Sequence, residues 1–317
     1  MYRIGVDLGG TNIVAGIVDE NNKIVCKGSI PTRRSATGIE ITNDILCAIK
    51  KAVDESNVSL SDISSIGLGT PGTVNRKAGI IEYANNLDFR DFPIKKYIED
   101  EFNIKTFIEN DANCAALGEA VAGAGNGVDN FVAITLGTGV GSGIVVNGQI
   151  VHGCNDAAGE MGHMVIKFGG ERCSCGRRGC WEAYASASAL INQTQDKMSK
   201  DFDTIMWEIV GGDIKKVDGR TAFDAMREGD AAAREVVNNY TYYLAVGIVN
   251  IINIFQPQIL CIGGGIGNEG ETLLTPVRYY VNNEHYTHDS EKQTTICCAK
   301  LGNDAGLIGA SLLEFQK

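Results

Sequence analysis

This sequence has no apolar stretch long enough to cross a lipid bilayer. Its most apolar window, residues 244–255, contains Asn250 and Asn253 and is shorter than the roughly 20 residues that a membrane helix needs. A strand-like run over residues 2–7 follows the initial methionine directly and leaves no room for a secretory signal peptide. We therefore expect a cytoplasmic protein without a membrane partner.

Positive charge and proline are also in short supply. The 317 residues include 28 Lys and Arg against 39 Asp and Glu, a net charge of −11. Nucleic acids and anionic lipid surfaces attract basic proteins, so neither is an expected partner. There are only 5 prolines but 39 glycines, which indicates tight loops between regular elements rather than disorder. The length suits about two domains of ordinary size.

Short strands and glycine turns are typical of the first part of the chain. Apolar runs over residues 3–7 and 13–18 enclose a glycine turn and predict a β-hairpin, and residues 23–29 would add a third strand. Over residues 38–56, apolar side chains recur every four positions, which predicts a helix. We expect further strands over 65–70 and 106–109, the second followed by a helix over 112–120.

The second half of the chain begins by repeating the first. Residues 132–139 and then 143–146 align with residues 4–11 and then 16–18 at a nearly constant offset. Such a duplication predicts an α/β fold with two similar domains that face each other across a cleft. We place residues 1–117 plus 302–317 in the smaller domain and residues 118–301 in the larger one. A helix over 237–255, strands over 259–262 and 294–299, and a closing helix over 304–315 are also expected.

Three cysteines and a histidine gather between residues 159 and 182. Cys173, Cys175 and Cys180 lie within eight positions, and His163 precedes the first of them by ten. Three cysteines and one histidine fill a tetrahedral zinc shell and leave no open position, which favours a structural ion. A disulfide is the alternative. Neighbours such as Cys173 and Cys175 would close a strained ring, however, and nothing marks the chain as secreted.

Two glycine turns, one in each copy of the repeat, are candidates for phosphate binding. Residues 9–11 and 137–139 would expose backbone N–H groups and threonine hydroxyls, which suit phosphate oxygens. Alone, either turn is an ordinary hairpin connection. Paired by the repeat, they favour a nucleotide held between two domains. Residues 265–270 match a dinucleotide fingerprint and offer a Rossmann alternative, but they lie far from the N-terminal βαβ unit where that fingerprint usually occurs.

Asp111 stands where a predicted strand meets the next helix. As a structural residue it would be the N-cap of that helix, since Asp is among the preferred cap residues. As a functional residue it would be a general base, because phosphoryl transfer to an alcohol needs a carboxylate that accepts the hydroxyl proton. The two roles are compatible, and Glu109 and Asn110 would orient the substrate or Asp111 itself.

Two further carboxylates, Glu160 and Glu182, flank the cysteine cluster. Ionised carboxylates accept strong hydrogen bonds, so both side chains suit the adjacent hydroxyls of a sugar. His163 could bind zinc through one ring nitrogen and contact the sugar through the other. The alternative is that both glutamates are ordinary surface or helix-terminal residues.

Seven motifs run in order over almost the whole chain. They are Asp7-Leu8-Gly9-Gly10-Thr11, Gly69-Thr70-Pro71-Gly72, Glu109-Asn110-Asp111-Ala112-Asn113, Leu136-Gly137-Thr138-Gly139-Val140-Gly141, Gly159-Glu160-Met161-Gly162-His163, Cys173-x-Cys175-Gly176-x-x-Gly179-Cys180-x-Glu182 and Gly263-Gly264-Gly265. In these motifs the sequence resembles the ROK family of sugar kinases and repressors. The resemblance implies an actin-like pair of α/β domains and phosphorylation of the 6-hydroxyl of glucose by ATP with Mg²⁺.

The resemblance also implies roles for individual residues. Asp111 would be the general base. The sugar would be bound by Gly72, Asn86, Asn110, Asp111, Glu160, His163 and Glu182. The phosphates, magnesium and adenosine would be surrounded by Asp7, Gly9, Gly10, Thr11, Asn12, Thr138, Gly139, Gly264 and Gly265. A structural zinc ion would be bound by His163, Cys173, Cys175 and Cys180. We further expect a homodimer or homotetramer.

Two departures from the family pattern bear on the choice of function. Glucose-specific members often read Asn-Leu-x-Trp where this chain has Asn86-Leu87-Asp88-Phe89, and Ser142 replaces a common glycine. A kinase for N-acetylmannosamine, N-acetylglucosamine, fructose or mannose is therefore an alternative. A repressor would need a DNA-binding helix-turn-helix ahead of the strand that begins at residue 3. A non-catalytic sugar sensor is a further alternative. A non-catalytic nucleotide switch is another, which the cysteine cluster with its two carboxylates disfavours.

Overall fold

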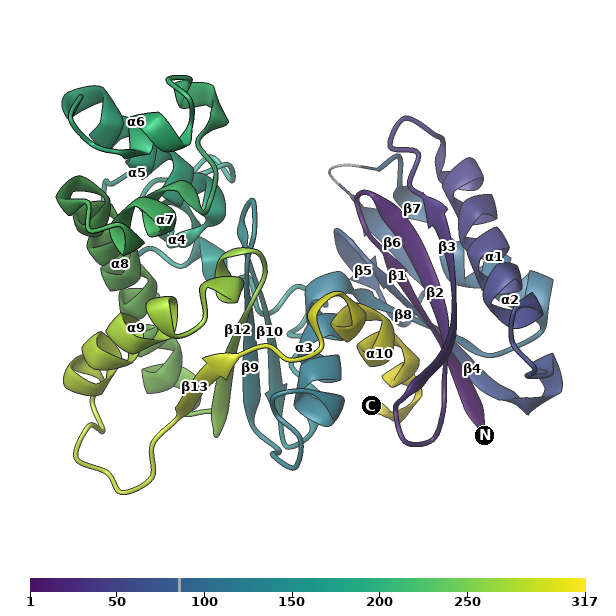
Figure 1. The fold of residues 1–317 in the computed structure, drawn as a ribbon. Helices are drawn as coiled ribbons and strands as arrows, with labels where there is room; N and C mark the ends of the chain where they lie inside the picture. The colour runs from purple at the N-terminus through teal and green to yellow at the C-terminus, as the bar shows by residue number, and fades with distance from the viewer. Residues whose placement is uncertain (85–86) are drawn as a thin grey trace. The chain divides into compact units, whose positions relative to one another are not determined.

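The computed structural model describes residues 1–84 and 87–317 (Figure 1). The chain divides into two compact units, Met1–Ala133 with Gly143–Gly159 and Lys300–Lys317, and Ile134–Ser142 with Glu160–Ala299. The domain boundaries expected from the sequence stay a prediction. None of the helices in the described residues combines the length and apolar character that a bilayer crossing requires.

The first unit is built on a five-stranded mixed sheet with the order β3-β2-β1-β4-β8. The strand β1 (Tyr2–Leu8) pairs antiparallel with β2 (Asn12–Val18), and β2 pairs antiparallel with β3 (Ile24–Pro31). On its other side β1 pairs parallel with β4 (Ile63–Thr70), which pairs parallel with β8 (Thr106–Asn110). The three parallel strands therefore end at one common edge of the sheet.

Helices cover both faces of this sheet (Figure 1). The helix α1 (Gly38–Asp54) packs on β2 and β3, whereas α10 (Ala305–Ser311) packs on β1, β4 and α3 (Asp111–Ala122). Glycine makes the second contact possible, because a Cβ atom at Gly5 would lie 1.9 Å from the carbonyl oxygen of Leu307. Besides these, the unit contains α2 (Ile94–Phe102), the 3-10 turns η1 (Leu60–Asp62), η5 (Gly302–Asp304) and η6 (Leu313–Phe315), and a small sheet of β5 (Thr73–Asn75), β6 (Ile80–Tyr83) and β7 (Arg90–Phe92).

A second five-stranded sheet has the order β11-β10-β9-β12-β13. Its strands are β9 (Phe131–Leu136), β10 (Val140–Val146), β11 (Gln149–Ile150), β12 (Ile259–Gly263) and β13 (Thr295–Cys298). Counted along the chain, both sheets have the same order of third, second, first, fourth and fifth strand. The mixed α/β fold class predicted from the internal repeat is confirmed. Two of the four boundaries between the units fall within β9 and β10.

The second unit contains most of the helices. They are α4 (Glu182–Ala185), α5 (Ala187–Lys200), α6 (Met206–Ile209), α7 (Thr221–Arg227), α8 (Ala231–Phe255) and α9 (Glu271–Glu284), with 3-10 turns η2 (Met161–His163), η3 (Ile214–Lys216) and η4 (Ile266–Glu269). Trp181 is fully buried against α8, where a Cβ atom at Gly247 would lie 2.0 Å from its ring. Its Nε1 donates to the carbonyl oxygen of Tyr243 at 2.9 Å. The residue just before α4 is thus anchored on the longest helix of the unit.

Some elements differ from the sequence expectation. The long helix begins at Ala231 instead of residue 237, because Asp230 caps it by accepting from the N–H of Ala233 at 2.7 Å. The closing helix ends at Ser311, and a 3-10 turn replaces its last residues. The helix α9 was not predicted, since Pro276 inside it reads as a helix breaker in the sequence.

Candidate active site

Three of the predicted segments meet at the carboxyl ends of β1, β4 and β8. The strand register places Asp7 beside Gly69, and Gly69 beside Glu109. Asn110 and Asp111 follow directly, where β8 passes into α3. In open α/β sheets, ligands bind at the carboxyl ends of the strands. This edge of the first unit is therefore a candidate for the reacting groups.

Asn110, not Asp111, is the N-cap of α3. Its backbone is extended, and its Oδ1 accepts from the N–H groups of Ala112 at 2.9 Å and Asn113 at 3.3 Å. The interpretation of Asp111 as the cap is wrong, because the amide of the preceding residue already takes the free helix N–H groups. Asp111 is the first helical residue, and its Oδ1 accepts from the N–H of Ala112 at 2.9 Å.

The carboxyl groups of Asp111 and Asp7 both have raised pKa values. Burial raises the pKa of Asp111, and hydrogen bonds such as that from the Ala112 N–H partly offset the effect. Burial first, and then the negative charge of Asp111, raises the pKa of Asp7 from 3.8 to about 6. Neighbouring buried carboxyls of this kind are typical of sites that bind a cation or accept a proton.

The first glycine loop, residues 9–11, joins β1 to β2 at this same edge. The carbonyl oxygen of Asn12, the first residue of β2, accepts from the N–H of Gly9 at 3.0 Å. Thr32 donates to the carbonyls of the first and third loop residues at 2.7 and 2.8 Å, and Arg34 Nε donates to that of Gly10 at 2.6 Å. The loop is therefore held in one conformation by the segment after β3.

Gly72 follows β4 and contacts another predicted sugar-binding residue. Its φ is +93°, and a Cβ atom there would lie 2.1 Å from the carbonyl oxygen of Tyr83, so only glycine fits. Asn110 Nδ2 donates to the carbonyl oxygen of Gly72 at 3.2 Å. The structure thus brings these two residues together. Asn86 lies outside the described residues.

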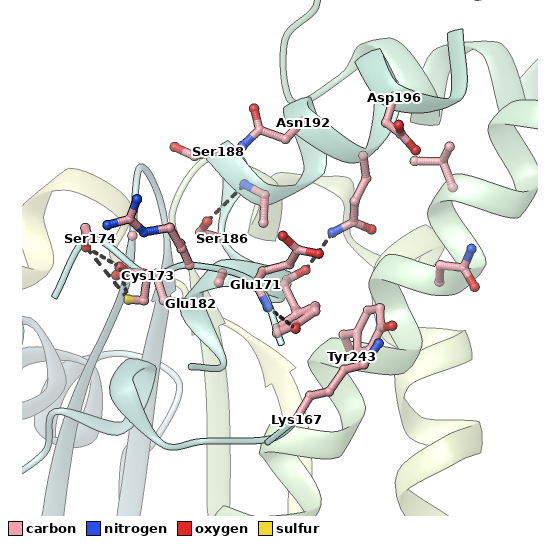
Figure 2. A pocket seen from close by; sticks show the side chains of 18 of the residues that line it. Lys167, Glu171, Cys173, Ser174, Glu182, Ser186, Ser188, Asn192, Asp196 and Tyr243 are labelled. Carbon is pink, nitrogen blue, oxygen red and sulfur yellow. Dashed lines mark hydrogen bonds between the residues drawn. The ribbon is translucent and has the colours of Figure 1, made fainter. Parts of the chain in front are cut away.

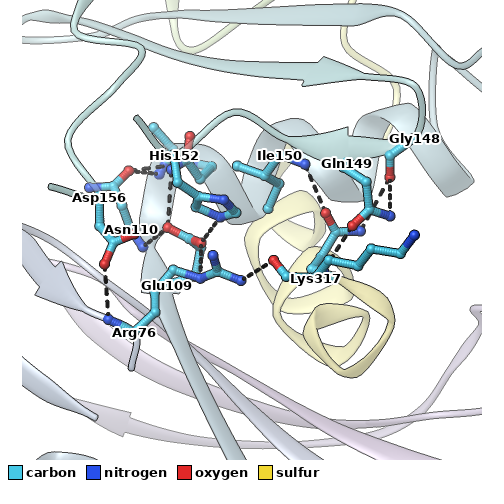
Figure 3. A network of polar contacts seen from close by, with 12 residues as sticks. Arg76, Glu109, Asn110, Gly148, Gln149, Ile150, His152, Asp156 and Lys317 are labelled. Atoms are coloured by element: carbon cyan, nitrogen blue, oxygen red, sulfur yellow. Dashed lines mark hydrogen bonds and ion pairs between the residues drawn. The ribbon is translucent and has the colours of Figure 1, made fainter. Parts of the chain in front are cut away.

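Glu109 is fully buried behind Asn110 (Figure 3). Its Oε1 accepts from the N–H of Asn110 at 2.8 Å and from Asn113 Nδ2 at 3.0 Å. Its Oε2 lies 2.8 Å from His152 Nε2 and 3.2 Å from Arg76 Nε. An enclosed carboxylate does not reach a substrate, so Glu109 orients Asn110 from inside the fold.

In the second unit, Glu182 connects the second glycine loop with the cysteine loop. It begins α4, and its Oε2 accepts from the N–H of Val140 at 3.1 Å while its Oε1 accepts from Ser174 Oγ at 2.9 Å. A Cβ atom at Gly139 would lie 2.3 Å from Glu182 Oε2. The glycine at that position lets the carboxylate approach the loop.

Glu160 and His163 lie at the two ends of one short turn. Glu160 directly precedes η2, and the N–H of His163 donates to its carbonyl oxygen at 3.1 Å. The turn packs closely on β10, since a Cβ atom at Gly162 would lie 2.3 Å from the carbonyl oxygen of Val140. The side chain of Glu160 is exposed and available to a ligand.

The cysteine and histidine side chains converge as zinc ligands would. The ligand atoms of His163, Cys173, Cys175 and Cys180 all lie within 4.8 Å of one another. The Sγ atoms of Cys175 and Cys180 are 3.7 Å apart, and Cys173 Sγ lies 3.5 Å from His163 Nδ1. A tetrahedron with Zn–S bonds of about 2.3 Å has edges of about 3.8 Å, so the donor set fits zinc. The ten cysteines are free thiols in this structure.

The thiols of the cluster differ in acidity. Burial raises the pKa of Cys180 to about 12 and raises that of Cys173. A hydrogen bond with the backbone of Arg177 lowers the pKa of Cys175. Because the thiolate is the form that binds a metal, a cation in the cluster would displace these protons.

The third glycine run, residues 263–265, lies against β9, the strand that leads into the second glycine loop. Gly264 follows β12 with a φ of +81°, and a Cβ atom there would lie 2.4 Å from the carbonyl oxygen of Leu136 at the end of β9. A Cβ atom at Gly265 would meet nothing within 4 Å among the described residues. Space for a ligand therefore adjoins Gly265.

A cavity of about 1050 Å³ opens beside the second glycine loop (Figure 2). Its lining includes Thr138, Gly139 and Glu182 and continues along α5 and α8 to Asn192 and Tyr243. Pockets that bind small-molecule ligands usually have volumes of about 300 to 1,000 Å³. The predicted phosphate and sugar residues of this unit thus border a volume of sufficient size for a ligand.

Sequence reasoning did not find Arg76, His152 or Trp181. Arg76 and His152 lie on loops far from Glu109 in the sequence, and no local pattern links them. Trp181 carried a signal, because it is one of only 2 tryptophans in the sequence and stands between two predicted site residues. An aromatic side chain at such a position indicates an anchor of the loop in the core.

Two sheets of the same strand order, with glycine turns at strand ends, form the duplicated α/β arrangement of the actin-like class. The chain belongs to the ROK family, whose family model matches residues 3–317. It is 39% identical to a glucokinase of Halalkalibacterium halodurans, over 100% of this chain and 96% of that protein. A xylose repressor of Bacillus spizizenii is 31% identical over 99% of this chain and 77% of that protein.

A solved structure shares the fold along nearly its full length. The crystal structure of a ROK family glucokinase from Streptomyces griseus in complex with glucose and AMPPNP has a TM-score of 0.81 and 32% identity, with 99% of each chain covered. The expected family and the actin-like fold type are confirmed.

Proposed function

We propose that this chain is a glucokinase, which transfers the γ-phosphoryl group of ATP to the 6-hydroxyl of glucose. The proposal is carried by the half-buried carboxyl of Asp111, with its raised pKa, at the edge of the sheet, in a chain with glucokinase relatives over its full length. Phosphoryl transfer needs little else from the protein than positioning, charge stabilisation and a group that accepts the hydroxyl proton.

Asp111 acts as the general base. It accepts the proton of the sugar hydroxyl while the hydroxyl oxygen attacks the γ-phosphorus. A raised pKa brings the carboxylate closer to the pH at which it works, which makes it a more effective base. Asn110 supports this role, because the cap that it forms fixes the first turn of α3 and therefore Asp111.

The glycine loops are the candidates for nucleotide binding. In the first unit, Thr11 and the backbone N–H groups of residues 9–12 would donate to phosphate oxygens. In the second unit, Thr138 and the backbone N–H groups of residues 137–139 would do the same, and the adenosine would lie by Gly264 and Gly265. Asp7 supplies a carboxylate oxygen of the kind that Mg²⁺ prefers, and its burial beside Asp111 fits a resident cation. Magnesium, when bound, neutralises negative charge on the phosphates.

Each unit has its own candidate residues for sugar binding. In the first unit they are Asn110 and the segment at Gly72, and in the second they are Glu160, His163 and Glu182. Zinc, when bound by His163 and the three cysteines, stabilises the loop that Glu182 joins through Ser174. Its role is structural, because the four ligands fill its coordination shell.

ADP release with Mg-ATP tests the substrate. Glucose, mannose, fructose, N-acetylglucosamine and N-acetylmannosamine should be compared in protein saturated with zinc. We expect the highest kcat/KM with glucose. A preference for an N-acetyl sugar would move the substrate while keeping the kinase, and no turnover with any sugar would instead indicate a sugar sensor, as the repressor relative suggests.

The substitution Asp111→Asn tests the base. An asparagine Oδ1 can still accept from the N–H of Ala112, so the helix and the sugar affinity should survive. We expect kcat to fall by roughly 10² to 10⁴, the usual contribution of a general base. Asp100→Asn, at an exposed carboxylate paired with Lys96, is the matched control. A kcat within a few-fold of wild type would refute the assignment of Asp111.

Cytoplasmic location and assembly stay predictions. We propose a homodimer or homotetramer, and light scattering of the purified protein would measure which one forms.

A further inference from the structure

Glu109 is the most enclosed charged group beside the proposed active site. Its side chain has no exposed surface, and its Oε2 lies 2.8 Å from His152 Nε2 and 3.2 Å from Arg76 Nε (Figure 3). The side chains of Arg76 and His152 are themselves only 22% and 13% exposed. A buried carboxylate requires such partners, since its charge is otherwise too costly to remove from water.

The other oxygen of Glu109 holds the proposed substrate residue. Oε1 accepts from the N–H of Asn110 at 2.8 Å and from Asn113 Nδ2 at 3.0 Å. Asn110 in turn donates through Nδ2 to the carbonyl oxygen of Gly72 at 3.2 Å. A single carboxylate orientation therefore determines the backbone position of Asn110 and, through it, the contact with Gly72.

Arg76 and His152 bring two further segments of the first unit to this carboxylate. Arg76 follows β5, and its backbone N–H donates to Asp156 Oδ2 at 3.2 Å. Asp156 adopts a left-handed conformation with a φ of 56°, four residues beyond His152 in the same loop. In the sequence this loop leads directly to Glu160. Glu109 thus joins three segments. One carries Asn110, one follows Gly72 and contains Arg76, and one contains His152 and precedes Glu160.

We propose that Arg76 and His152 are positioning residues that set the affinity of the enzyme for its sugar. They act through Glu109, which they hold in the orientation that fixes Asn110 and Gly72. The inference rests on the proposed kinase function, and it adds residues that no motif of the chain contains.

The physical reason is the directionality of sugar recognition. A hydroxyl bound by an amide and a carbonyl is recognised only when both groups keep their positions. If Glu109 loses one partner, its buried charge draws in water, and the bond to the Asn110 N–H loosens. Small displacements of this kind can reduce the efficiency of an enzyme by roughly tenfold to a hundredfold. Nucleotide contacts at the glycine loops should be unaffected.

Steady-state kinetics with glucose and Mg-ATP tests the inference. In Arg76→Gln we expect the KM for glucose to rise by roughly tenfold or more, with the KM for ATP within about twofold of wild type. His152→Ala should behave in the same way. His152→Gln keeps a nitrogen donor near the position of Nε2 and should restore most of the affinity. Arg76→Lys, which keeps the charge, provides a measurable variant if Arg76→Gln does not fold.

Arg3→Gln is the matched control. Arg3 is also buried, at 5% exposure, and donates to the carbonyl oxygen of Asp19 and to Asn22 Oδ1 away from the proposed site. We expect this variant to lose stability while it keeps the wild-type KM for glucose. An increase in the glucose KM equal to that in Arg76→Gln would show that general destabilisation, not positioning, causes the effect.

A double-mutant cycle tests whether Arg76 acts through Asn110. Once the Asn110 side chain is removed, Arg76 has no sugar contact left to position, so Arg76→Gln should raise the glucose KM less than about twofold in an Asn110→Ala background. Equal increases in both backgrounds would overturn the inference, as would a parallel increase in the KM for ATP. A wild-type chain without sugar-dependent ADP release would overturn the proposed function and this inference together. An active wild type with unshifted variants would overturn the inference alone.

Discussion

Replacing Asp7 by asparagine should stabilise the ligand-free protein at neutral pH and abolish its kinase activity. The carboxyl of Asp7 lies at the end of β1, where burial and the charge of Asp111 raise its pKa from 3.8 to about 6. In the unfolded chain the pKa has its ordinary value. The folded state therefore binds the proton more tightly than the unfolded state does.

The magnitude and sign follow from this difference in pKa. The stability that protonated Asp7 contributes is fully present below pH 3.8 and is lost as the pH rises through about 6. At about 1.4 kcal/mol for each pH unit, the interval from 3.8 to about 6 amounts to about 3 kcal/mol. Asparagine has nearly the same shape and carries no charge, so the variant avoids this loss. Such a gain in stability at the expense of function is typical of active-site residues.

Urea denaturation of both proteins at pH 7.5 and pH 4 measures the effect. We expect Asp7→Asn to exceed the wild type by up to about 3 kcal/mol at pH 7.5, and the difference to vanish near pH 4. Asp100→Asn, at an exposed carboxylate, should show no such difference. A gain of equal size at both pH values, or lower stability at pH 7.5, would refute the argument. Retained kinase activity would contradict the proposed role of Asp7 in magnesium binding.

Three further perturbations test other parts of the structure. A strong chelator, or the substitution Cys180→Ser, should remove zinc and weaken glucose binding, because the proposed zinc ion would stabilise the loop joined to Glu182. Elemental analysis that finds no zinc in active protein would contradict this. Glu119→Gln should lower the free energy of unfolding by about 1 to 3 kcal/mol, because the buried carboxylate accepts from three backbone N–H groups. A free energy of unfolding within about 0.5 kcal/mol of wild type, the size of an ordinary surface change, would contradict this. Gly309→Ala should lower the free energy of unfolding by about 1 to 3 kcal/mol, because its Cβ atom would lie 1.7 Å from a carbonyl oxygen of α3. In Gly265→Ala the new Cβ atom meets no other atom, so the melting temperature should stay unchanged while the KM for ATP rises.

Local sequence patterns predicted much of the fold. Short apolar runs and glycine turns placed β1 and β2 within a residue or two of their observed bounds, and the fourfold period over α1 predicted its buried stripe. The repeat predicted the shared strand order, because each copy contains the same succession of strands and turns. The four residues of the metal cluster could be named for a similar reason, since their spacing alone suits a single ion.

Patterns in the sequence could not predict which hydrogen-bond partner a polar side chain would have. Asn110 and Asp111 are both good cap residues, and only the backbone at the start of α3 made Asn110 the cap and left the carboxyl of Asp111 beside Asp7. Similarly, Glu182 was expected to bind a ligand, whereas its contacts with Val140 and Ser174 also make it a link between two loops.

The sequence by itself determined the fold class, the family, the glycine loops and the cysteine–histidine cluster. These depend on short-range periodicity, on the backbone freedom of glycine and on ligand spacing, all of which are properties of residues close together in the sequence. Only the tertiary structure decided that Glu109 faces inward between Arg76 and His152, and that burial raises the pKa of Asp7 to about 6. Burial and charge pairing arise between residues that are distant in the chain, so they exist only once the strands have paired and the helices have packed.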